Sequence, residues 1–527
     1  MRADLQFRSI PALARAAGAR FGDVEAIVDG DTRLSFEELA ATATTAARAF
    51  VASGIQPGDR VAIWAPNSWE WVVALLGLQS AGAVLVPLNT RFKGTEAGYI
   101  LRRSRARALC TVGEFLGTSY VDLLDGRELP DLATVVLLRG ESPVVPGWAE
   151  FCSRAASAEA GDVDARIASL GPDAVADLIF TSGTTGVPKG VVATHGQALR
   201  AFGDWAEIVG LAAGDRYLIV NPMFHTFGYK AGIVACLIAG ATMLPARTFD
   251  VDAVLDLIAR ERVTVLPGPP TIYQSLLRNS RRAATDLSSL RLAATGAAVI
   301  PSALVGQMKA ELGFETVITA YGLTEACGFV TACRQGDDAE TIASTSGRAI
   351  PDVEVRVVDE AGGEVPRGST GEIVCRGYNV MQGYFEDPDQ TSEAIDARGW
   401  LHTGDIGTMD ERGNLRIVDR KKDLFIVGGF NAYPAEIENL LLANPAIAQA
   451  AVVGVPDDRL GEVGEAFIVL QPGADLDEDS LLLWARGEMA NFKIPRRVHF
   501  VEALPLNASG KIVKGELRRR LARPGDS

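Results

Sequence analysis

The sequence has few of the features that mark metalloproteins or disulfide-linked secreted proteins. Its 527 residues include only four histidines, which are dispersed, and six cysteines without a CxxC pair. The histidine spacing predicts no resident metal site, so any metal is expected to arrive with a substrate. The cysteines stand among apolar or small residues and indicate free thiols in a reducing cytoplasm rather than a zinc ribbon or a disulfide framework.

Long hydrophobic runs are also missing. The N-terminus lacks the apolar core of a secretory signal. The longest apolar stretch, Val72 to Leu88, is interrupted by Gln79, Ser80 and Pro87 and is too short for a membrane span. It predicts a buried helix that runs into a strand, so we expect a cytoplasmic protein without a membrane span.

The charge balance excludes a further class. With 51 Lys+Arg against 66 Asp+Glu, the net charge is −15, which is too acidic for a general nucleic-acid binder. The motifs GxGxxG and GxSxG are absent, so neither a dehydrogenase nor a serine hydrolase is indicated. The 48% hydrophobic and 22% charged content is that of a globular protein, and the length predicts more than one structural unit.

Helical patterns alternate with short Val/Ile/Leu runs from about residue 35 onward. Ser35 and Glu38 form a capping-box pattern that opens a helix, and Arg60 to Trp64 reads as the following strand. The same helix–strand alternation recurs at 69–77 with 83–87, 251–261 with 263–266, and 301–313 with 316–320. It predicts an α/β protein whose mostly parallel sheets are covered by helices.

The pattern changes after about residue 345. Short strands separated by glycine turns, at 353–359, 371–376 and 414–419, predict a small β-rich subdomain over about 345–420. Beyond it, a helix (434–444), a strand (450–455) and another helix (480–490) indicate a compact α/β unit. We therefore predict an N-terminal domain over residues 1–420 and a small, mobile C-terminal domain over 421–527.

The segment Phe180 to Gly190 carries the most specific local signal. Glycines let several N–H groups converge on an anion, while hydroxyls and a lysine add donors and positive charge, so this loop predicts phosphate binding. Its phosphate-binding candidates are Thr181, Ser182, Gly183, Thr184, Thr185, Gly186 and Lys189. It is not a Walker loop, because Lys189 follows Pro188 and precedes Gly190 between two predicted strands. The alternative is a polar turn with an exposed lysine.

This loop resembles the signature of the adenylate-forming superfamily, which comprises acyl-CoA synthetases, carrier-loading adenylation domains and firefly-luciferase-like enzymes. The resemblance covers nearly the whole chain, because further family motifs follow in order. They are Pro222-Met-Phe-His-Thr-Phe-Gly, Thr295-Gly-Ala-Ala, Tyr321-Gly-Leu-Thr-Glu, Gly399-Trp-Leu-His-Thr-Gly-Asp, Asp419-Arg-Lys-Lys-Asp and Asn507-Ala-Ser-Gly-Lys. The resemblance implies ATP, Mg²⁺, coenzyme A and a small-molecule carboxylic acid as cofactors and substrates.

The motif at Tyr321 follows a predicted strand, at the strand end where open α/β sheets bind ligands. An aromatic ring, a hydroxyl and a carboxylate suit adenine, phosphate and magnesium. The resemblance assigns these roles to Tyr321 with Gly322, to Thr324 at the α-phosphate and to Glu325 on the metal. The alternative is a strand end followed by a helix that Thr324 caps.

For other positions, a functional role is indicated only by the resemblance. It places an adenine-side loop at Gly296, Ala297 and Ala298, and ribose contacts at Asp405 and Arg420. Taken alone, such glycine and alanine triplets are mostly packing residues, and a turn aspartate is mostly a local cap.

His225 stands between two phenylalanines, where a lone histidine is more often a core residue. The resemblance instead places it beside the acyl carboxylate. Tyr229 and Lys230, just downstream, are candidates to line the same acyl pocket.

The resemblance also assigns residues of the C-terminal unit. It implies that Lys511 bridges carboxylate and α-phosphate during adenylation, that Lys422 is the hinge, and that Gly428 and Gly429 form the loop presented for thioesterification. A charged linker is the alternative for Lys422. For the basic residues between 514 and 520 we expect only a solvated tail.

The predicted function is an acid:CoA ligase that forms an acyl-AMP and then a thioester. Three segments, at 221–233, 265–277 and 430–436, resemble family members that act on polycyclic acids, which implies a bulky propanoic acid of steroid or terpenoid origin. The alternatives are a medium- or long-chain fatty acyl-CoA ligase, an enzyme that loads a carrier protein, and a specialist for one half-reaction. A non-catalytic sensor would be expected to lose Lys189, Glu325 or Lys511. The sequence does not predict the oligomeric state.

Overall fold

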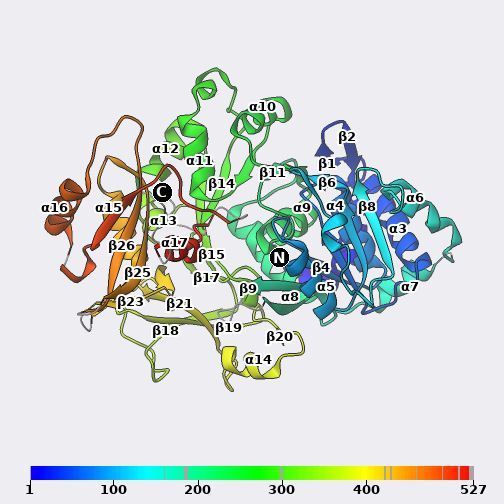
Figure 1. Ribbon diagram of the computed structural model, residues 1–527. Helices are drawn as coiled ribbons and strands as arrows, with labels where there is room; N and C mark the ends of the chain where they lie inside the picture. The colour runs from blue at the N-terminus through cyan, green and yellow to red at the C-terminus, as the bar shows by residue number, and fades with distance from the viewer. Residues whose placement is uncertain are drawn as a thin grey trace.

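The computed structural model describes residues 2–159, 161–182, 188–296, 300, 302–420, 423–427, 430–457, 460–489, 491–507 and 511–521. Helices cover two large, mostly parallel sheets in the N-terminal part (Figure 1). A smaller group of strands and helices, coloured orange to red, forms the C-terminal part. This arrangement confirms the predicted α/β fold class.

The first large sheet is parallel through its centre. Its strand order is β17 (Arg348–Ala349), β16 (Thr331–Ala332), β15 (Thr316–Tyr321), β14 (Leu292–Gly296), β13 (Val265–Pro267), β11 (Arg216–Ile219), β12 (Thr242–Pro245), β1 (Glu25–Asp29) and β2 (Thr32–Ser35). The strands from β15 to β1 run parallel, and β2, β16 and β17 are antiparallel edges. On one face, side chains of α10 (Val251–Glu261) and α12 (Ser302–Leu312) pack against these strands.

The second large sheet ends in an antiparallel hairpin. Its order is β20 (Gly383–Tyr384), β10 (Pro188–Thr194), β9 (Val175–Ser182), β4 (Val84–Pro87), β3 (Arg60–Trp64), β5 (Ala106–Val112) and β8 (Thr134–Arg139). The strands from β9 to β8 are parallel, whereas β9, β10 and β20 pair antiparallel. This hairpin carries the residues on either side of the predicted phosphate loop.

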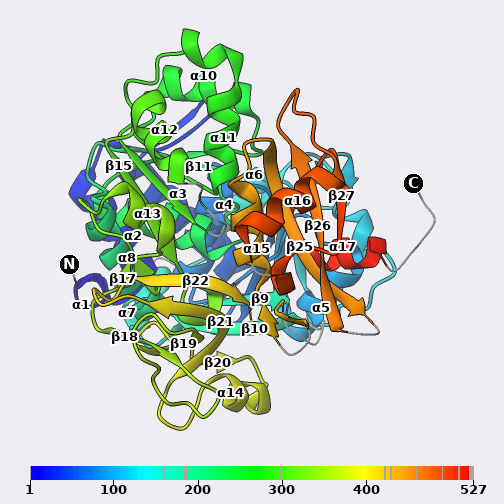
Figure 2. The same cartoon turned by 90° about the vertical axis from the view of Figure 1, so that its left-hand side faces the viewer.

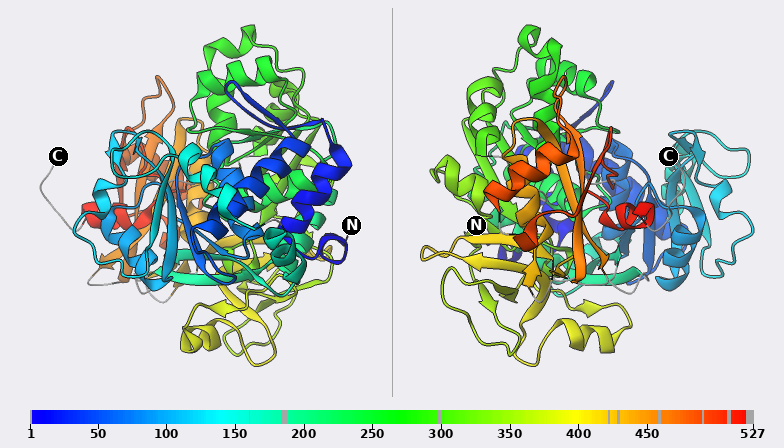
Figure 3. Two further views of the ribbon diagram at one scale, coloured as in Figure 1. Left: turned by 90° about the vertical axis from the view of Figure 1, so that its right-hand side faces the viewer. Right: turned by 60° about the vertical axis from the view of Figure 1, so that its left-hand side comes forward.

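The helices predicted at Ser35 and at 69–77 are present, and two further helices, α1 (Ala3–Phe7) and α2 (Ile10–Phe21), precede them. Helix α3 (Phe36–Ala52) opens with the predicted capping box: Glu38 N donates to Ser35 Oγ (3.1 Å) and Ser35 N donates to the Glu38 carboxylate (2.8 Å). Helix α4 (Trp69–Ser80) is buried nearly all round and packs on α3 and α2, so its apolar run is core; the left view of Figure 3 shows this N-terminal side. Within the described residues, no helix is both long and apolar enough to cross a membrane.

The predicted β-rich subdomain is an antiparallel sheet. Its order is β18 (Val353–Val358), β19 (Gly371–Gly377), β21 (Leu401–Met409) and β22 (Leu415–Arg420), and the short helix α14 (Pro388–Ala394) lies between β20 and β21 in sequence. This part occupies the lower edge of the molecule in Figure 1.

The C-terminal part has its own sheet and its own cores (Figure 2). The sheet contains β24 (Phe430–Ala432), β23 (Phe425–Val427), β26 (Gly461–Leu470), β25 (Ile447–Asp457) and β27 (Arg497–Phe500), with helices α15 (Pro434–Leu442), α16 (Glu478–Glu488) and α17 (Lys514–Leu521). Because side chains alternate along a strand, Ala450 and Val452 enter one core and Ala451 and Val453 the other. The predicted domain boundary at 420/421 falls where β22 of one sheet ends and β23 of another is about to begin; Lys422 lies outside the described residues.

The expectation of a solvated C-terminal tail is wrong for Lys514 and Arg518, whereas Arg519 and Arg520 are exposed as expected. Residues 514–521 form helix α17, whose Leu517 is fully buried. Lys514 forms an ion pair with Glu438 (2.9 Å) and Arg518 with Asp423 (3.1 Å). Lys514 and Arg518 therefore fasten the helix to its domain, a role that charge and sequence position alone do not reveal.

Candidate functional site

The hairpin β9–β10 brings two predicted phosphate ligands opposite each other. Thr181 and Lys189 are cross-strand partners, so Lys189 lies on strand β10 and not in the loop where it was predicted. The Thr181 hydroxyl donates to Glu325 Oε1 at 3.2 Å. Residues Gly183, Thr184, Thr185 and Gly186 lie outside the described residues, as does the side chain of Ser182.

Glu325 lies just beyond the end of β15, in a single 3-10 turn (Thr324–Ala326). One carboxylate oxygen, Oε1, accepts from the Thr181 hydroxyl and from the Tyr384 hydroxyl, each at 3.2 Å. The turn's N-cap is Leu323, and it has no side-chain capping bond. The interpretation of Thr324 as a helix cap is therefore wrong.

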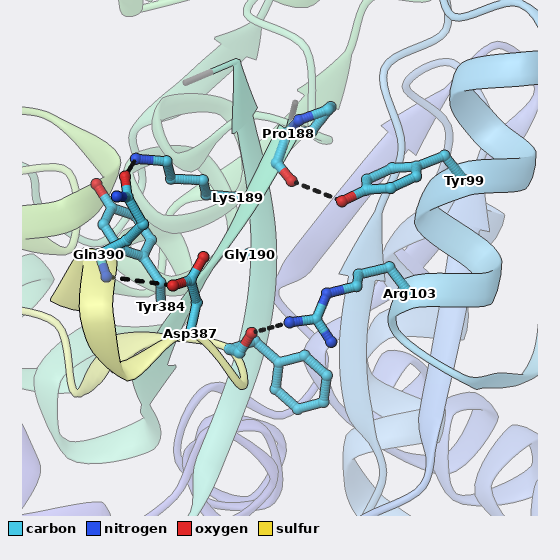
Figure 4. Close-up of a pocket in the computed structure, with 9 residues that line it drawn as sticks. Tyr99, Arg103, Pro188, Lys189, Gly190, Tyr384, Asp387 and Gln390 are labelled. Atoms are coloured by element: carbon cyan, nitrogen blue, oxygen red, sulfur yellow. Dashed lines mark hydrogen bonds between the residues drawn. The ribbon is translucent and has the colours of Figure 1, made fainter. Parts of the chain in front are cut away.

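Lys189 contacts Tyr384 and Gln390. Its ammonium group donates to Gln390 Oε1 and lies 5.1 Å from the centre of the Tyr384 ring (Figure 4). These residues line a small pocket together with Tyr99 and Arg103 of α5 (Gly94–Arg103). Sequence reasoning missed Tyr384 and Gln390, because the pairing of β20 with β10 that brings them here is a long-range contact.

The predicted adenine-side residues meet at neighbouring strand ends. Gly296 ends β14 and pairs with Ala320, one residue before Tyr321 ends β15. A Cβ atom at Gly296 would lie 2.7 Å from the Ala320 carbonyl oxygen, and one at Gly322 would lie 2.1 Å from that of Gly328. Glycine is therefore required at both positions by close backbone approach. Ala297 and Ala298 lie outside the described residues.

The predicted ribose ligands lie beside the adenine position. The Tyr321 hydroxyl donates to Asp405 Oδ2 at 2.5 Å, and Asp405 is 5% exposed. Asp405 is also the cross-strand partner of Arg420 in the β21–β22 pair. The structure thus brings together three residues separated by 99 positions of sequence; the side chain of Arg420 is outside the described part.

The positive charge of Lys511 acts on His225 although 286 residues separate the two in sequence. His225 begins the turn that enters the π-helix Phe227–Val234. Burial, and then the positive charge of Lys511, lower the pKa of His225 to about 4. Lys511 is placed by a short bridge between Leu506 and Ile512, and the Leu506 carbonyl accepts from Arg91 of the N-terminal body at 2.9 Å. The segment that contains Lys511 is thus anchored to the N-terminal body through Leu506.

This proximity predicts a measurable titration. His225 should stay neutral throughout the neutral pH range, and its pKa should rise in the Lys511→Ala variant because a nearby positive charge is lost. The chain has only four histidines, so their ring signals can be followed by NMR against pH and assigned with His225→Gln. An unchanged His225 pKa in Lys511→Ala would show that the two groups are not neighbours in solution.

Tyr229 and Lys230 are buried deeper than His225. The Tyr229 hydroxyl accepts from Gln79 Nε2 at 3.1 Å, and the Lys230 ammonium contacts Asp177 of β9 at 3.1 Å and Cys327 Sγ at 3.4 Å. Lys230 and Asp177 are each 1% exposed. The ion pair ties the histidine motif to the strand that leads to Thr181 and to the turn that holds Glu325. An acyl-pocket role for the two residues stays a prediction.

Comparison with known proteins places this geometry in a family. The model of the AMP-binding enzyme family matches residues 13–385, and that of the AMP-binding enzyme C-terminal domain matches residues 436–511. The chain therefore belongs to the AMP-binding enzyme family.

Full-length relatives narrow the class. The chain is 49% identical over 514 residues to a methyl-dioxo-octahydroindenyl propanoyl:CoA ligase of Rhodococcus jostii, covering 96% of this chain and 98% of the relative. It is 51% identical over 511 residues to the Mycobacterium tuberculosis ligase of the same name, covering 97% and 98%. The ATP-bound structure of MatB from Rhodopseudomonas palustris superposes with a TM-score of 0.86 at 32% identity, covering 97% of this chain and 99% of MatB. The protein is an AMP-forming acyl-CoA ligase that uses ATP and CoA.

Proposed function

We propose that the acid is a bulky polycyclic propanoic acid of steroid or terpenoid origin. The support is the similarity, over almost the whole length of both chains, to two ligases named for a fused-ring propanoate. The buried free cysteines fit a reducing, cytoplasmic location for this reaction.

In the first step, the acid carboxylate attacks the α-phosphate of ATP and pyrophosphate leaves. Two anions must approach each other, so positive charge at the reacting atoms is the main requirement. We assign this role to Lys511 beside His225, with Lys189 and the hydroxyls of Thr181 and Thr324 on the phosphates. Tyr321, Asp405 and Arg420 would hold the adenosine, and the neutral His225 would shape the carboxylate site.

Magnesium is expected to enter with ATP. Mg²⁺ is commonly bound by one or two carboxylates together with substrate phosphates, and Glu325 offers one carboxylate flanked by two hydroxyls. Among the described residues, no group of three or more His, Cys, Asp or Glu side chains could hold a metal alone. Glu325 therefore fits a shared ion that neutralises phosphate charge.

In the second step, the CoA thiolate attacks the acyl-AMP carbonyl and AMP leaves. We propose that the C-terminal domain rotates about Lys422 between the steps, withdrawing Lys511 and presenting Gly428 and Gly429 to the pantetheine arm. Two observations support the proposal: the positive charge of Lys511 adds to burial in lowering the pKa of His225, and Leu506, close to Lys511 in sequence, accepts a hydrogen bond from Arg91 of the N-terminal body.

A panel of linear, aromatic and polycyclic acids tests the substrate. Pyrophosphate release and acyl-CoA formation should be followed in parallel, with free CoA and a phosphopantetheinyl carrier protein as alternative acceptors. We expect kcat/KM to be at least about tenfold higher for fused-ring propanoates than for straight-chain acids. A preference for straight chains, or transfer to the carrier only, would contradict the proposed substrate or acceptor.

A further inference from the structure

Tyr384 touches two oppositely charged groups of the site at once. Its hydroxyl donates to Glu325 Oε1 at 3.2 Å, while its ring lies beneath the Lys189 ammonium, 5.1 Å from the ring centre. A tyrosine attracts a cation through the face of its ring and donates a hydrogen bond through its hydroxyl. Figure 4 shows Tyr384 between Lys189 and the start of α14. One side chain therefore contacts both the metal candidate and the phosphate candidate.

The backbone holds Tyr384 firmly in this position. Tyr384 pairs with Val191 on β10, and its N–H donates to the Thr391 hydroxyl at 2.9 Å. A Cβ atom at the preceding Gly383 would lie 2.9 Å from the Thr391 side chain, and its φ of +139° also favours glycine. The ring is thus fixed to the same strand that carries Lys189.

Gln390 completes the arrangement from helix α14. Its side-chain oxygen accepts from Lys189, and its side-chain nitrogen donates to Glu393 Oε2 at 2.6 Å. Its backbone N–H donates to the N-cap residue Asp387 at 3.2 Å. The amide is therefore oriented with its oxygen toward the ammonium, so Lys189 is held from two directions.

The Tyr384 hydroxyl donates to one oxygen of the Glu325 carboxylate, Oε1. The protonated hydroxyl occupies one lone pair of Glu325 and leaves the other carboxylate oxygen for a ligand.

We propose that Tyr384 is a positioning residue. It orients Glu325 to bind magnesium and Lys189 to bind the phosphates, and Gln390 also positions Lys189. This rests on the proposed adenylation roles of Glu325 and Lys189. It separates two functions within one side chain: the hydroxyl serves the metal ligand and the ring serves the lysine.

Three substitutions separate these functions. Tyr384→Phe keeps the ring and removes the hydroxyl, so the Mg²⁺ concentration for half-maximal pyrophosphate release should rise about tenfold while the KM for ATP at saturating Mg²⁺ stays near wild type. Gln390→Leu should raise the KM for ATP severalfold without changing the Mg²⁺ requirement. Tyr384→Leu removes both contacts and should show both defects.

Binding without turnover provides an independent readout. ATP alone and ATP with Mg²⁺ should each raise the melting temperature of the wild type, and Tyr384→Phe should selectively lose the extra rise that Mg²⁺ adds. Tyr378→Phe is the matched control, because it removes the same kind of bond, from a tyrosine hydroxyl to a carboxylate, between Tyr378 and Asp204 at 2.8 Å, and Tyr378 does not line this pocket. It should behave like the wild type in every assay.

The outcomes distinguish this proposal from the proposed function. If the wild type releases no pyrophosphate with any acid, the adenylation function fails. If the wild type is active and Tyr384→Phe and Tyr384→Leu match Tyr378→Phe in Mg²⁺ requirement, ATP KM and melting shift, the positioning role of Tyr384 is refuted. Equal defects in Tyr384→Phe and Tyr384→Leu would refute the division between hydroxyl and ring.

Discussion

The Lys511→Ala variant is expected to release pyrophosphate about 10²- to 10³-fold more slowly than the wild type, the range measured when one preorganised transition-state contact is removed. Lys511 comes from the C-terminal domain and lies close enough to His225 to lower its pKa. We propose that its ammonium group offsets the repulsion between carboxylate and α-phosphate. Thioester formation from supplied acyl-AMP and CoA should stay within a few-fold of wild type, because the proposed rotation withdraws Lys511 before that step.

The comparison needs both half-reactions measured on the same preparation. Arg519→Ala is the matched control, because Arg519 is exposed on α17 of the same domain and its loss removes the same charge. That variant should leave both rates unchanged. Equal loss of adenylation and thioesterification in Lys511→Ala would contradict domain alternation.

The second large effect concerns the buried pair Lys230–Asp177. Lys230→Met leaves Asp177 buried without its counter-ion, so the variant should lose about 3–5 kcal/mol of unfolding free energy. The wild-type carboxyl already has a raised pKa, because burial outweighs the attraction of Lys230. Without Lys230 its pKa should rise further, so the folded state binds a proton that the unfolded state releases. Stability of Lys230→Met should therefore fall as pH rises above about 4.

The double variant Lys230→Met/Asp177→Asn tests this explanation. It removes both charges while keeping similar volumes, and we expect it to recover most of the lost stability and to lose the added pH dependence. Urea unfolding across a pH series measures both. If Lys230→Met lowers the free energy of unfolding by only about 1 kcal/mol or less, the value typical of an exposed ion pair, the pair is not buried in solution.

Local patterns in the sequence predicted much of the fold. Three examples are the capping box at Ser35, the apolar run that forms α4 and β4, and the helix–strand pattern that ends at 316–320. Each depends on residues that are neighbours in sequence, so each can be recognised without tertiary contacts. Site residues embedded in several family motifs, such as Tyr321 and Asp405, were predicted together, and the structure places them in contact.

Other features depend on contacts that a sequence does not display. Tyr384 reaches the site only because β20 pairs with β10, about 190 residues earlier. Lys230 lies on a π-helix that begins just after His225. The wider turn of a π-helix changes which side chains share a face. The short sequence distance between His225 and Lys230 therefore did not reveal where the Lys230 side chain points. The sequence around Lys514 and Arg518 does not show that each pairs with a carboxylate from a distant part of the chain.

The central claim is that one site forms acyl-AMP and then the thioester. The most direct test mixes enzyme in excess over a fused-ring propanoic acid with Mg·ATP, first without CoA and then with it. We predict one pyrophosphate and one bound acyl-AMP per acid in the first phase, and equal amounts of acyl-CoA and AMP after CoA is added. Release of ADP and phosphate, or the absence of any acyl-AMP before CoA, would contradict the account.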